Sequence, residues 1–182
     1  MTLRDLTQQF TSEGRIETIV LRPTRGEPAV LVDEARAEPG QGLLGDRRAN
    51  AVRSGKQSTK RELTLFQAEH LPLVANWCGL AELPPSRLRR NIVVSGLNLI
   101  GMRSPFADVV LEWIVGAEVI IQITGPCDPC SKMAAALGLG SYNALRGHGG
   151  VTARIVSGGL IRVGDSVRLH AIRQLEPKIK SS

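Results

Sequence analysis

Two of the three cysteines lie close together, in the segment Gly-Pro-Cys-Asp-Pro-Cys-Ser-Lys-Met at residues 125–133. The mostly β-branched residues 119–124 predict a strand before this segment, and residues 131–137 predict a short helix that ends at Gly138. Cys130 would then lie at the beginning of a helix, where free backbone N–H groups, the helix dipole and nearby Lys132 favour a thiolate. If the protein has a reactive atom, we expect it to be the sulfur of Cys130.

A pair of cysteines with this spacing can be half of a zinc site, a dithiol redox centre, or a single reactive or metal-binding thiol assisted by its neighbour. No second pair supports a zinc finger, because Cys78 is remote and the histidines at 70, 148 and 170 have no finger spacing. The order strand, Cys-Asp-Pro-Cys, helix is similar to a thioredoxin active site, but the chain lacks the βαβ alternation of that fold. Cys130 and Cys127 are therefore both candidate catalytic residues.

Three other segments carry residues suited to binding an anion. Residues 39–48 are rich in glycine and end in charged residues, although a solvated turn explains them equally well. Residues 84–91 place three arginines and an asparagine before an expected strand, where planar guanidinium groups can bind phosphate or carboxylate. In residues 144–154, glycines flank Arg146 and His148 and allow the backbone to approach a ligand closely.

The composition indicates one small globular domain with a basic surface. The chain has 182 residues, a net charge of +6 and only 3% aromatic residues, so its core must be aliphatic. The charge suits an anionic partner, either a phosphorylated small molecule or a nucleic acid. The basic residues 53–60 include no aromatic side chain on which a base could stack, so we do not expect nucleic-acid binding there.

The pattern of turns and apolar residues predicts a mostly β fold with a few short helices. Nineteen glycines and ten prolines favour short strands. We expect a loose N-terminal arm at residues 1–13, a single domain at 14–172 and a polar tail at 173–182. Strands are expected at 14–23, 28–34, 62–66, 92–96, 109–115 and 118–124, a partly helical segment at 67–78, and a final hairpin that joins 151–157 to 160–169 through Gly158 and Gly159.

The hydrophobic runs do not indicate a secreted or membrane protein. The N-terminal residues include no apolar signal region, and charged or turn residues interrupt each hydrophobic run before it could span a bilayer. Three cysteines without a disulfide pattern fit a reducing compartment. We expect a soluble, cytoplasmic protein with no membrane partner.

Taken together and in order, these motifs resemble a MOSC domain, the family named for the C-terminal domain of molybdenum cofactor sulfurases. The resemblance covers about residues 14–170. It is carried by Gly-Leu-Leu-Gly-Asp-Arg at 42–47, Arg-Arg-Asn-Ile-Val-Val at 89–94, Pro-Cys-Asp-Pro-Cys-Ser-Lys-Met at 126–133, Arg-Gly-His-Gly-Gly-Val at 146–151 and Ile-Arg-Val-Gly-Asp at 161–165.

The resemblance implies a mixed, closed or near-closed β-barrel and a pocket that binds molybdenum cofactor (molybdopterin) or handles sulfur for it. Cys130 matches the family's cysteine, which implies a molybdenum ligand or a carrier of activated sulfur, and soft sulfur suits either role. The residues implied to bind the cofactor are Asp46, Arg47, Arg89, Arg90, Asn91, Lys132, Arg146, His148 and Gly149. We expect Gly45, Asp46, Arg89, Arg90, Cys130, Arg146 and His148 to converge on one mouth of the barrel.

The function implied by the resemblance stays open between two classes. One is an enzyme that reduces N-hydroxylated compounds or transfers sulfur, acting on a small-molecule substrate. The other is a non-catalytic carrier of molybdenum cofactor, and a dithiol oxidoreductase is a third interpretation. The resemblance also implies molybdenum ion binding and pyridoxal phosphate binding. We expect no fused sulfurase or electron-transfer domain, and therefore expect any sulfur or electrons to come from a separate protein.

Overall fold

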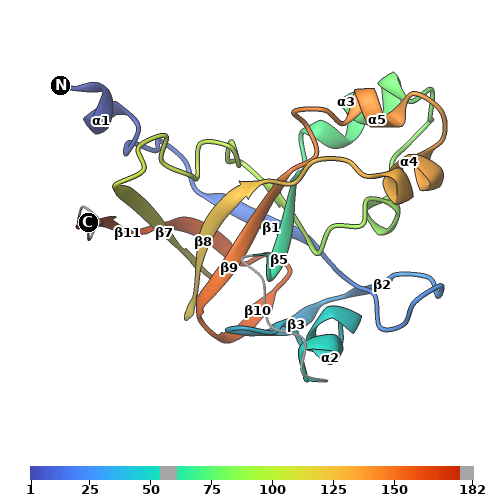
Figure 1. Cartoon of the computed structure of the whole chain (residues 1–182), viewed down its shortest axis with the longest axis horizontal. Helices are drawn as coiled ribbons and strands as arrows, with labels where there is room; N and C mark the ends of the chain where they lie inside the picture. The colour runs from blue at the N-terminus through green and yellow to red at the C-terminus, as the bar shows by residue number, and fades with distance from the viewer. Residues whose placement is uncertain (54–60, 177–182) are drawn as a thin grey trace, which may run out of the picture.

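The computed structural model describes residues 1–53 and 61–176 and consists mainly of β-strands with five short helices (Figure 1). The strands are β1 (Gly14–Leu21), β2 (Val30–Val32), β3 (Glu34–Glu38), β4 (Gly42–Leu43), β5 (Leu63–Gln67), β6 (Ile92–Ser95), β7 (Val109–Val115), β8 (Val119–Pro126), β9 (Val151–Ser157), β10 (Gly159–Arg162) and β11 (Ser166–Gln174). The helices are α1 (Leu3–Leu6), α2 (Arg47–Arg53), α3 (His70–Trp77), α4 (Ser131–Leu137) and α5 (Ser141–Ala144), with a 3₁₀ turn η1 (Pro85–Arg87).

Seven strands close into a barrel in the order β11, β7, β8, β9, β5, β6, β1, because β1 also pairs with β11. Strands β5 and β6 are parallel, and the other neighbours are antiparallel, so the barrel is mixed. Strand β2 continues the sheet beyond β1, and β10, β3 and β4 form a second, small sheet. The predicted mostly β fold with a closed mixed barrel is confirmed.

The barrel interior is filled almost entirely by aliphatic side chains, as the low aromatic content predicts. Ile16, Ile19, Leu65 and Ile121 are among the residues with no more than 1% of their surface exposed. Trp113 is the large exception: it is fully buried, and its indole Nε1–H donates to the Met102 carbonyl at 2.8 Å. Each such aliphatic side chain contributes about 1.5–3 kcal/mol through burial, so the closed sheet is a rigid support for the loops at its ends.

A small helical cap lies at one end of the barrel and carries the cysteine segment (Figure 1). Its apolar core forms where α3, α4 and α5 pack near η1 and β5, around Phe66, Leu88, Met133, Leu137 and Leu145. The helix predicted after the cysteines is α4, and the sequence did not predict α5. Because Met133 and Leu137 are buried, α4 is fixed on the barrel and holds the residues before it in place.

The predicted C-terminal hairpin is wrong. Strand β10 pairs with β3 in the second sheet instead of with β9, and β11 pairs with β7 and β1. The two glycines allow close approach between segments: a Cβ at Gly159, where φ is +156°, would collide with the Glu118 side chain, and one at Gly158 would lie 2.7 Å from the Ala37 carbonyl oxygen. The Gly-Gly pair therefore marks a crossing between sheets, which the sequence alone does not distinguish from a tight turn.

Described residues of the predicted N-terminal arm and C-terminal tail take part in regular structure and side-chain contacts. The N-terminal residues include α1, the Arg4 guanidinium makes two hydrogen bonds with the Asp108 carboxylate, and Phe10 packs edge-on against Trp113. Strand β11 continues through Gln174, into the predicted tail. Residues 54–60, most of the basic stretch at 53–60, and residues 177–182 lie outside the described part of the chain. None of the described helices is long and apolar enough to cross a membrane.

Candidate functional site

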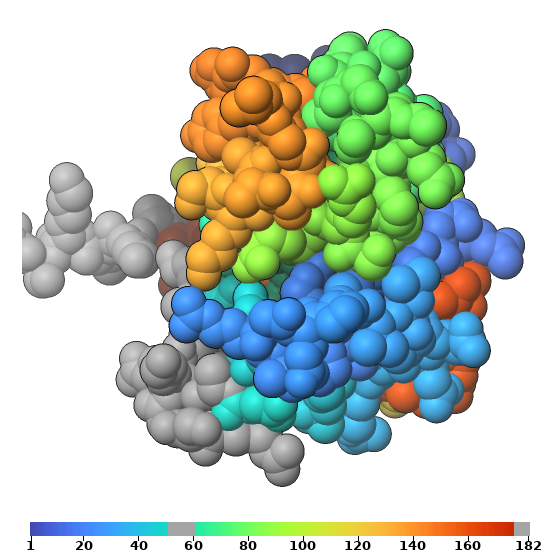
Figure 2. Space-filling view, turned by 90° about the vertical axis from the view of Figure 1, so that its right-hand side faces the viewer, coloured from blue at the N-terminus to red at the C-terminus, as the bar shows by residue number. Residues whose placement is uncertain are grey.

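A basic cleft of about 510 Å³ lies between the cysteine segment, the start of β6, the loop after β1 and the start of α2. It opens on the face shown in Figure 2, with residues of the helical cap above it and the segment after β1 below. Its lining comprises Arg22, Arg25, Asp46, Arg47, Arg48, Arg61, Thr64, Arg89, Arg90, Asn91, Cys127, Asp128 and Cys130. The structure thus brings both predicted catalytic cysteines together with Asp46, Arg47, Arg89, Arg90 and Asn91.

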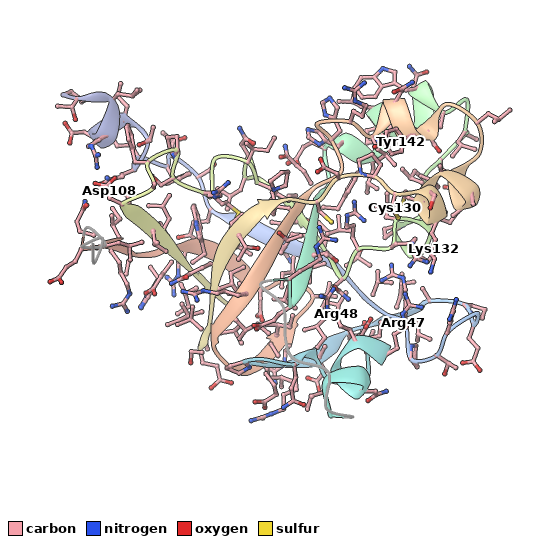
Figure 3. The ribbon with its side chains drawn as sticks, in the orientation of Figure 1. Arg47, Arg48, Asp108, Cys130, Lys132 and Tyr142 are labelled. Atoms are coloured by element: carbon pink, nitrogen blue, oxygen red, sulfur yellow. The ribbon has the colours of Figure 1, made fainter. Side chains whose placement is uncertain are left out.

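The two thiols of the cleft lie in different surroundings. Cys127 is only 4% exposed, its N–H donates to the Gly150 carbonyl at 2.8 Å, and burial raises the pKa of its thiol. Cys130 is exposed and directly precedes α4, as the sequence predicts. In Figure 3, Cys130 lies across the cleft from Arg47 and Arg48. Because a thiolate and not a thiol is the nucleophile or metal ligand, this arrangement favours Cys130 over Cys127 as the reactive sulfur.

Arg90 clamps the walls of the cleft together. Its side chain is buried, its Nε donates to the Gly149 carbonyl at 2.7 Å, and its Nη2 donates to the Cys127 carbonyl at 2.8 Å. Longer bonds reach the carbonyls of Leu88, Arg89 and Asp128. The guanidinium donors are therefore directed at the main chain, and Arg90 fixes the cysteine segment to the loop before β9.

The Asp46 carboxylate accepts three hydrogen bonds that join separate segments around the cleft. One carboxylate oxygen accepts hydrogen bonds from the Arg22 N–H at 3.0 Å and from the Asn91 amide at 3.3 Å, and the other accepts from the Arg48 N–H at 3.0 Å. The Asn91 side-chain oxygen in turn accepts from the Thr64 hydroxyl at 2.9 Å. These contacts join the end of β1, the start of α2 and the start of β6, so Asp46 and Asn91 position the arginines around them.

Seven arginines and only two aspartates line the cleft among the residues that the structure describes. Burial is the main cause that lowers the pKa of Arg22, to about 10, and it also lowers those of Arg48 and Arg90. Gathering like charges in a partly desolvated site is unfavourable unless an anion compensates them. Arg89 has a left-handed backbone with φ of +54°, a conformation that costs a residue other than glycine about 1–3 kcal/mol. The cleft is thus suited to binding an anion beside an exposed thiol.

Four predicted binding residues are absent from the described lining of the cleft: Lys132, Arg146, His148 and Gly149. Lys132 and Arg146 are exposed, and Figure 3 shows Lys132 near Cys130. The His148 ring packs against His70 and Trp77, with ring centroids 4.7 and 5.0 Å away. His148 thus packs against α3, and its convergence with Gly45 and Arg146 on the mouth that holds Cys130 stays a prediction.

Gly149 contributes through its backbone. Its carbonyl accepts the Arg90 bond, and a Cβ in its place would collide with the Cys127 carbonyl oxygen. The close approach of these two loops thus requires glycine at this position.

Sequence reasoning missed four arginines of the cleft: Arg22, Arg25, Arg48 and Arg61. Arg22 and Arg25 follow a strand on either side of Pro23 and Thr24, a context typical of solvated loops. Only the closed barrel brings that loop opposite the cysteines. Within residues 1–53 and 61–176, no three histidine, cysteine, aspartate or glutamate side chains are grouped as metal ligands.

Comparisons with known proteins agree with this architecture. The sequence profile of the MOSC domain matches residues 43–168. The fold is similar to that of the YuaD protein from Bacillus subtilis, with a TM-score of 0.67 and 18% identity over 87% of this chain and 96% of that one. It is also similar to YiiM from Geobacillus stearothermophilus, with a TM-score of 0.64 and 18% identity over 87% of this chain and 75% of that one. YiiM from Escherichia coli gives a TM-score of 0.58 at 18% identity, over 86% and 70% of the two chains. No curated protein matches the sequence.

Proposed function

Because the chain belongs to the MOSC domain family, we propose that its basic cleft binds molybdenum cofactor and that the Cys130 thiolate is a ligand of the molybdenum. Family membership supports a function related to molybdenum cofactor in general. The observation that supports the specific proposal is that one cleft combines an exposed thiol with seven arginines.

The residues of the cleft fit the chemical groups of this cofactor. A thiolate is a soft ligand suited to a redox-active transition metal, and guanidinium groups bind phosphate through paired hydrogen bonds. The volume of about 510 Å³ lies within the range of small-molecule sites. A phosphate would also compensate the charge of partly buried guanidinium groups such as Arg22.

The proposal divides the residues of the cleft by role. Arg22, Arg25, Arg47 and Arg89 are the candidates to hold the phosphate, because they line the cleft. Arg90, Asp46, Asn91 and Gly149 hold the walls together through their hydrogen bonds, most of which involve the main chain. Cys127 supports the segment that carries Cys130. The proposed binding roles of Lys132, Arg146 and His148, and pyridoxal phosphate binding, stay predictions of the family resemblance.

We propose an enzyme as the first candidate and a carrier of the cofactor as the second. When bound, the cofactor supplies two-electron redox chemistry, which would suit reduction of N-hydroxylated compounds with electrons from a separate protein. Sulfur transfer through Cys130, from a separate sulfur donor, is the alternative reaction. The open cleft and the exposure of Cys130 also favour a carrier that hands the cofactor on. Purified holoprotein that turns over a substrate with an external reductant would support the enzyme, whereas transfer of cofactor to an acceptor without turnover would support the carrier.

The test of binding is the molybdenum and pterin content of protein purified from a host that makes the cofactor. We expect equal amounts of molybdenum and pterin in the wild type. The double variant Arg25→Gln/Arg89→Gln should lose most of both, because it removes two cleft guanidinium groups. Arg168→Gln, an exposed change on β11 outside the described cleft lining, is the matched control and should retain both. Wild-type protein that contains neither molybdenum nor pterin would contradict the proposal.

A further inference from the structure

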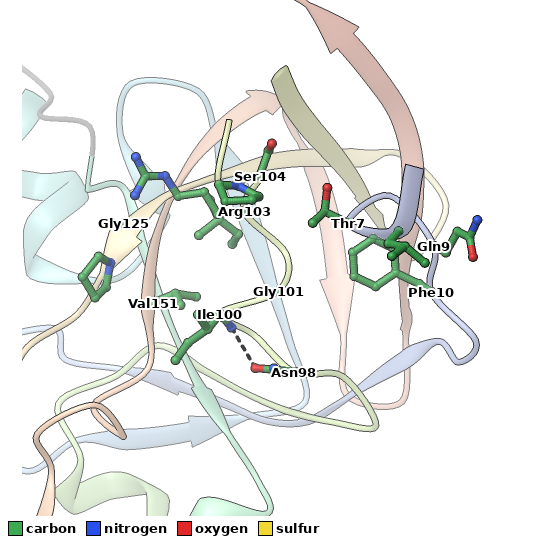
Figure 4. Close-up of a pocket in the computed structure, with 14 residues that line it drawn as sticks. Thr7, Gln9, Phe10, Asn98, Ile100, Gly101, Arg103, Ser104, Gly125 and Val151 are labelled. Carbon is green, nitrogen blue, oxygen red and sulfur yellow. Dashed lines mark hydrogen bonds between the residues drawn. The ribbon is translucent and has the colours of Figure 1, made fainter. Parts of the chain in front are cut away.

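A second cleft of about 600 Å³ lies on the other side of the segment that ends β8, and its lining is mostly apolar (Figure 4). We propose that this apolar cleft binds an organic anion with an apolar body, such as a fatty or aromatic carboxylate or sulfonate. The proposal does not depend on what the basic cleft binds.

The N-terminal residues form one wall of the apolar cleft, and Figure 4 shows them facing Gly125 and Val151 across it. Leu6 and Phe10 lie on this wall, Ile100 and Pro105 come from the loop after β6, and Ile123 comes from β8. Ile100 is 59% exposed and Leu6 51%, although both are large apolar residues. An apolar ligand body would remove this surface from water, at roughly 25 cal/mol for each Å² buried.

The N-terminal wall is held in place before any ligand binds. Arg4 bonds to Asp108 at 2.9 and 3.1 Å, and its guanidinium lies 4.4 Å from the centre of the Phe106 ring. Phe10 packs against Trp113 at a centroid distance of 4.7 Å. A preformed cleft orders few groups when a ligand enters, which favours binding of a small molecule.

The positive charge of Arg103 favours a negatively charged ligand. It is exposed on the lining of the apolar cleft, and its guanidinium has no hydrogen-bond or ion-pair partner among the described residues. Of the neutral polar side chains in the lining, the Ser104 hydroxyl accepts from the Phe106 N–H, and the Asn98 side-chain oxygen accepts from the Ile100 N–H. Arg103 is the one charged side chain in the described lining, so a single carboxylate or sulfonate on an apolar body is the complementary ligand.

Gly125 leaves the floor of the cleft open. A Cβ at this position would meet no atom within 4 Å, so a side chain there would enter empty space. Its carbonyl accepts from the Thr152 hydroxyl at 3.2 Å, which fixes the backbone. Cys127, two residues after Gly125, lines the basic cleft. The segment 125–127 is therefore a wall shared by the two clefts. Because a Cβ at Gly125 meets no atom, we expect Gly125→Leu to place its side chain in the apolar cleft without a clash at the Cβ.

The test uses 8-anilinonaphthalene-1-sulfonate, a sulfonate with an apolar aromatic body whose fluorescence increases in apolar surroundings. We expect wild-type protein to bind the dye and decanoate to displace it, with decanol a much weaker competitor. Arg103→Gln should weaken decanoate binding about tenfold, the effect of one lost charged hydrogen bond, and leave decanol unchanged. Gly125→Leu should abolish the fluorescence, and Arg168→Gln should bind the dye like the wild type. Circular dichroism and thermal melting show whether each variant is folded.

Two results would overturn the proposal. In the first, inorganic phosphate displaces the dye as well as decanoate does, which would place the dye among the arginines of the basic cleft. In the second, folded Gly125→Leu protein retains the fluorescence. Because the readout is dye binding to protein without molybdenum, failure here leaves the proposal for the basic cleft standing, and the reverse also holds.

Discussion

Replacing Arg90 with methionine tests whether this residue is the clamp of the basic cleft. Methionine keeps much of the length and apolar volume of the side chain but removes every donor. The carbonyls of Gly149 and Cys127 would then lose hydrogen bonds of 2.7 and 2.8 Å inside the protein. Since those bonds join the cysteine segment to the loop before β9, both segments should loosen together.

The expected loss of stability follows from these two short bonds. A hydrogen bond with a charged donor contributes about 1.5–3 kcal/mol, so the pair accounts for about 3–6 kcal/mol. Removing a desolvated guanidinium offsets part of this loss, because burying a charge is itself unfavourable. We expect the free energy of unfolding to fall by about 3 kcal/mol, which for a chain of this size lowers Tm by about 6–12 °C.

Urea denaturation of the wild type and the variant measures this change, with Arg89→Met as the control. The Arg89 side chain has no hydrogen-bond partner among the described residues, so its replacement should change stability by less than about 0.5 kcal/mol. A thiol reagent such as dithionitrobenzoate should also reach Cys127 faster in Arg90→Met than in the control. Equal stability of the two variants, with equal Cys127 reactivity, would refute the clamp.

Three further predictions concern the thiols and a half-buried histidine. Iodoacetamide at pH 7 should modify Cys130 much faster than Cys127, because Cys130 is exposed and burial raises the pKa of the Cys127 thiol; peptide mass spectrometry measures both rates, and equal rates would contradict this assignment. Cys130→Ser should abolish cofactor-dependent activity while Cys127→Ser retains most of it, since one sulfur suffices as a ligand; similar losses in both, in protein without molybdenum, would support dithiol chemistry instead. Burial is the main cause that lowers the pKa of His70, and the charge of His148 lowers it further. The unfolded chain therefore binds this proton at a higher pH than the folded chain, so the free energy of unfolding should fall as the pH decreases below 6.5. Urea denaturation at several pH values measures how the free energy of unfolding changes with pH, and this dependence should be weaker in His70→Phe. One full proton corresponds to roughly 1.4 kcal/mol per pH unit, and we expect a fraction of this because the ring is only half-buried. An unchanged pH dependence would exclude His70 as the cause.

Much of the barrel could be predicted because its strands have local patterns. Alternating or continuous β-branched runs mark β1, β6, β7 and β8, each bounded by glycine, proline or charged residues. The pairing of β10 could not be predicted, because a strand of four residues that begins at the second of two glycines fits a hairpin and a crossing equally well. Its partner β3 is more than a hundred residues away in the sequence, and only packing of the whole sheet selects it.

The candidate site was predicted in part for a similar reason. Motifs at strand ends, such as Arg89 and the two cysteines, converge because a closed barrel brings strand ends together. Which way a side chain points depends on acceptors from distant segments. Arg90 turns inward to carbonyls of two other loops, and His148 turns away to pack on α3. Neither acceptor nor packing partner is visible in the local sequence.

The central claim is that Cys130 provides a sulfur ligand to molybdenum in the basic cleft. X-ray absorption at the molybdenum K-edge, on wild-type protein and Cys130→Ser purified from a host that makes the cofactor, tests it most directly. We expect the variant to retain pterin through the cleft arginines and its spectrum to show one sulfur ligand fewer than the wild type. Identical sulfur coordination in the two proteins, or wild-type protein without molybdenum, would contradict the claim.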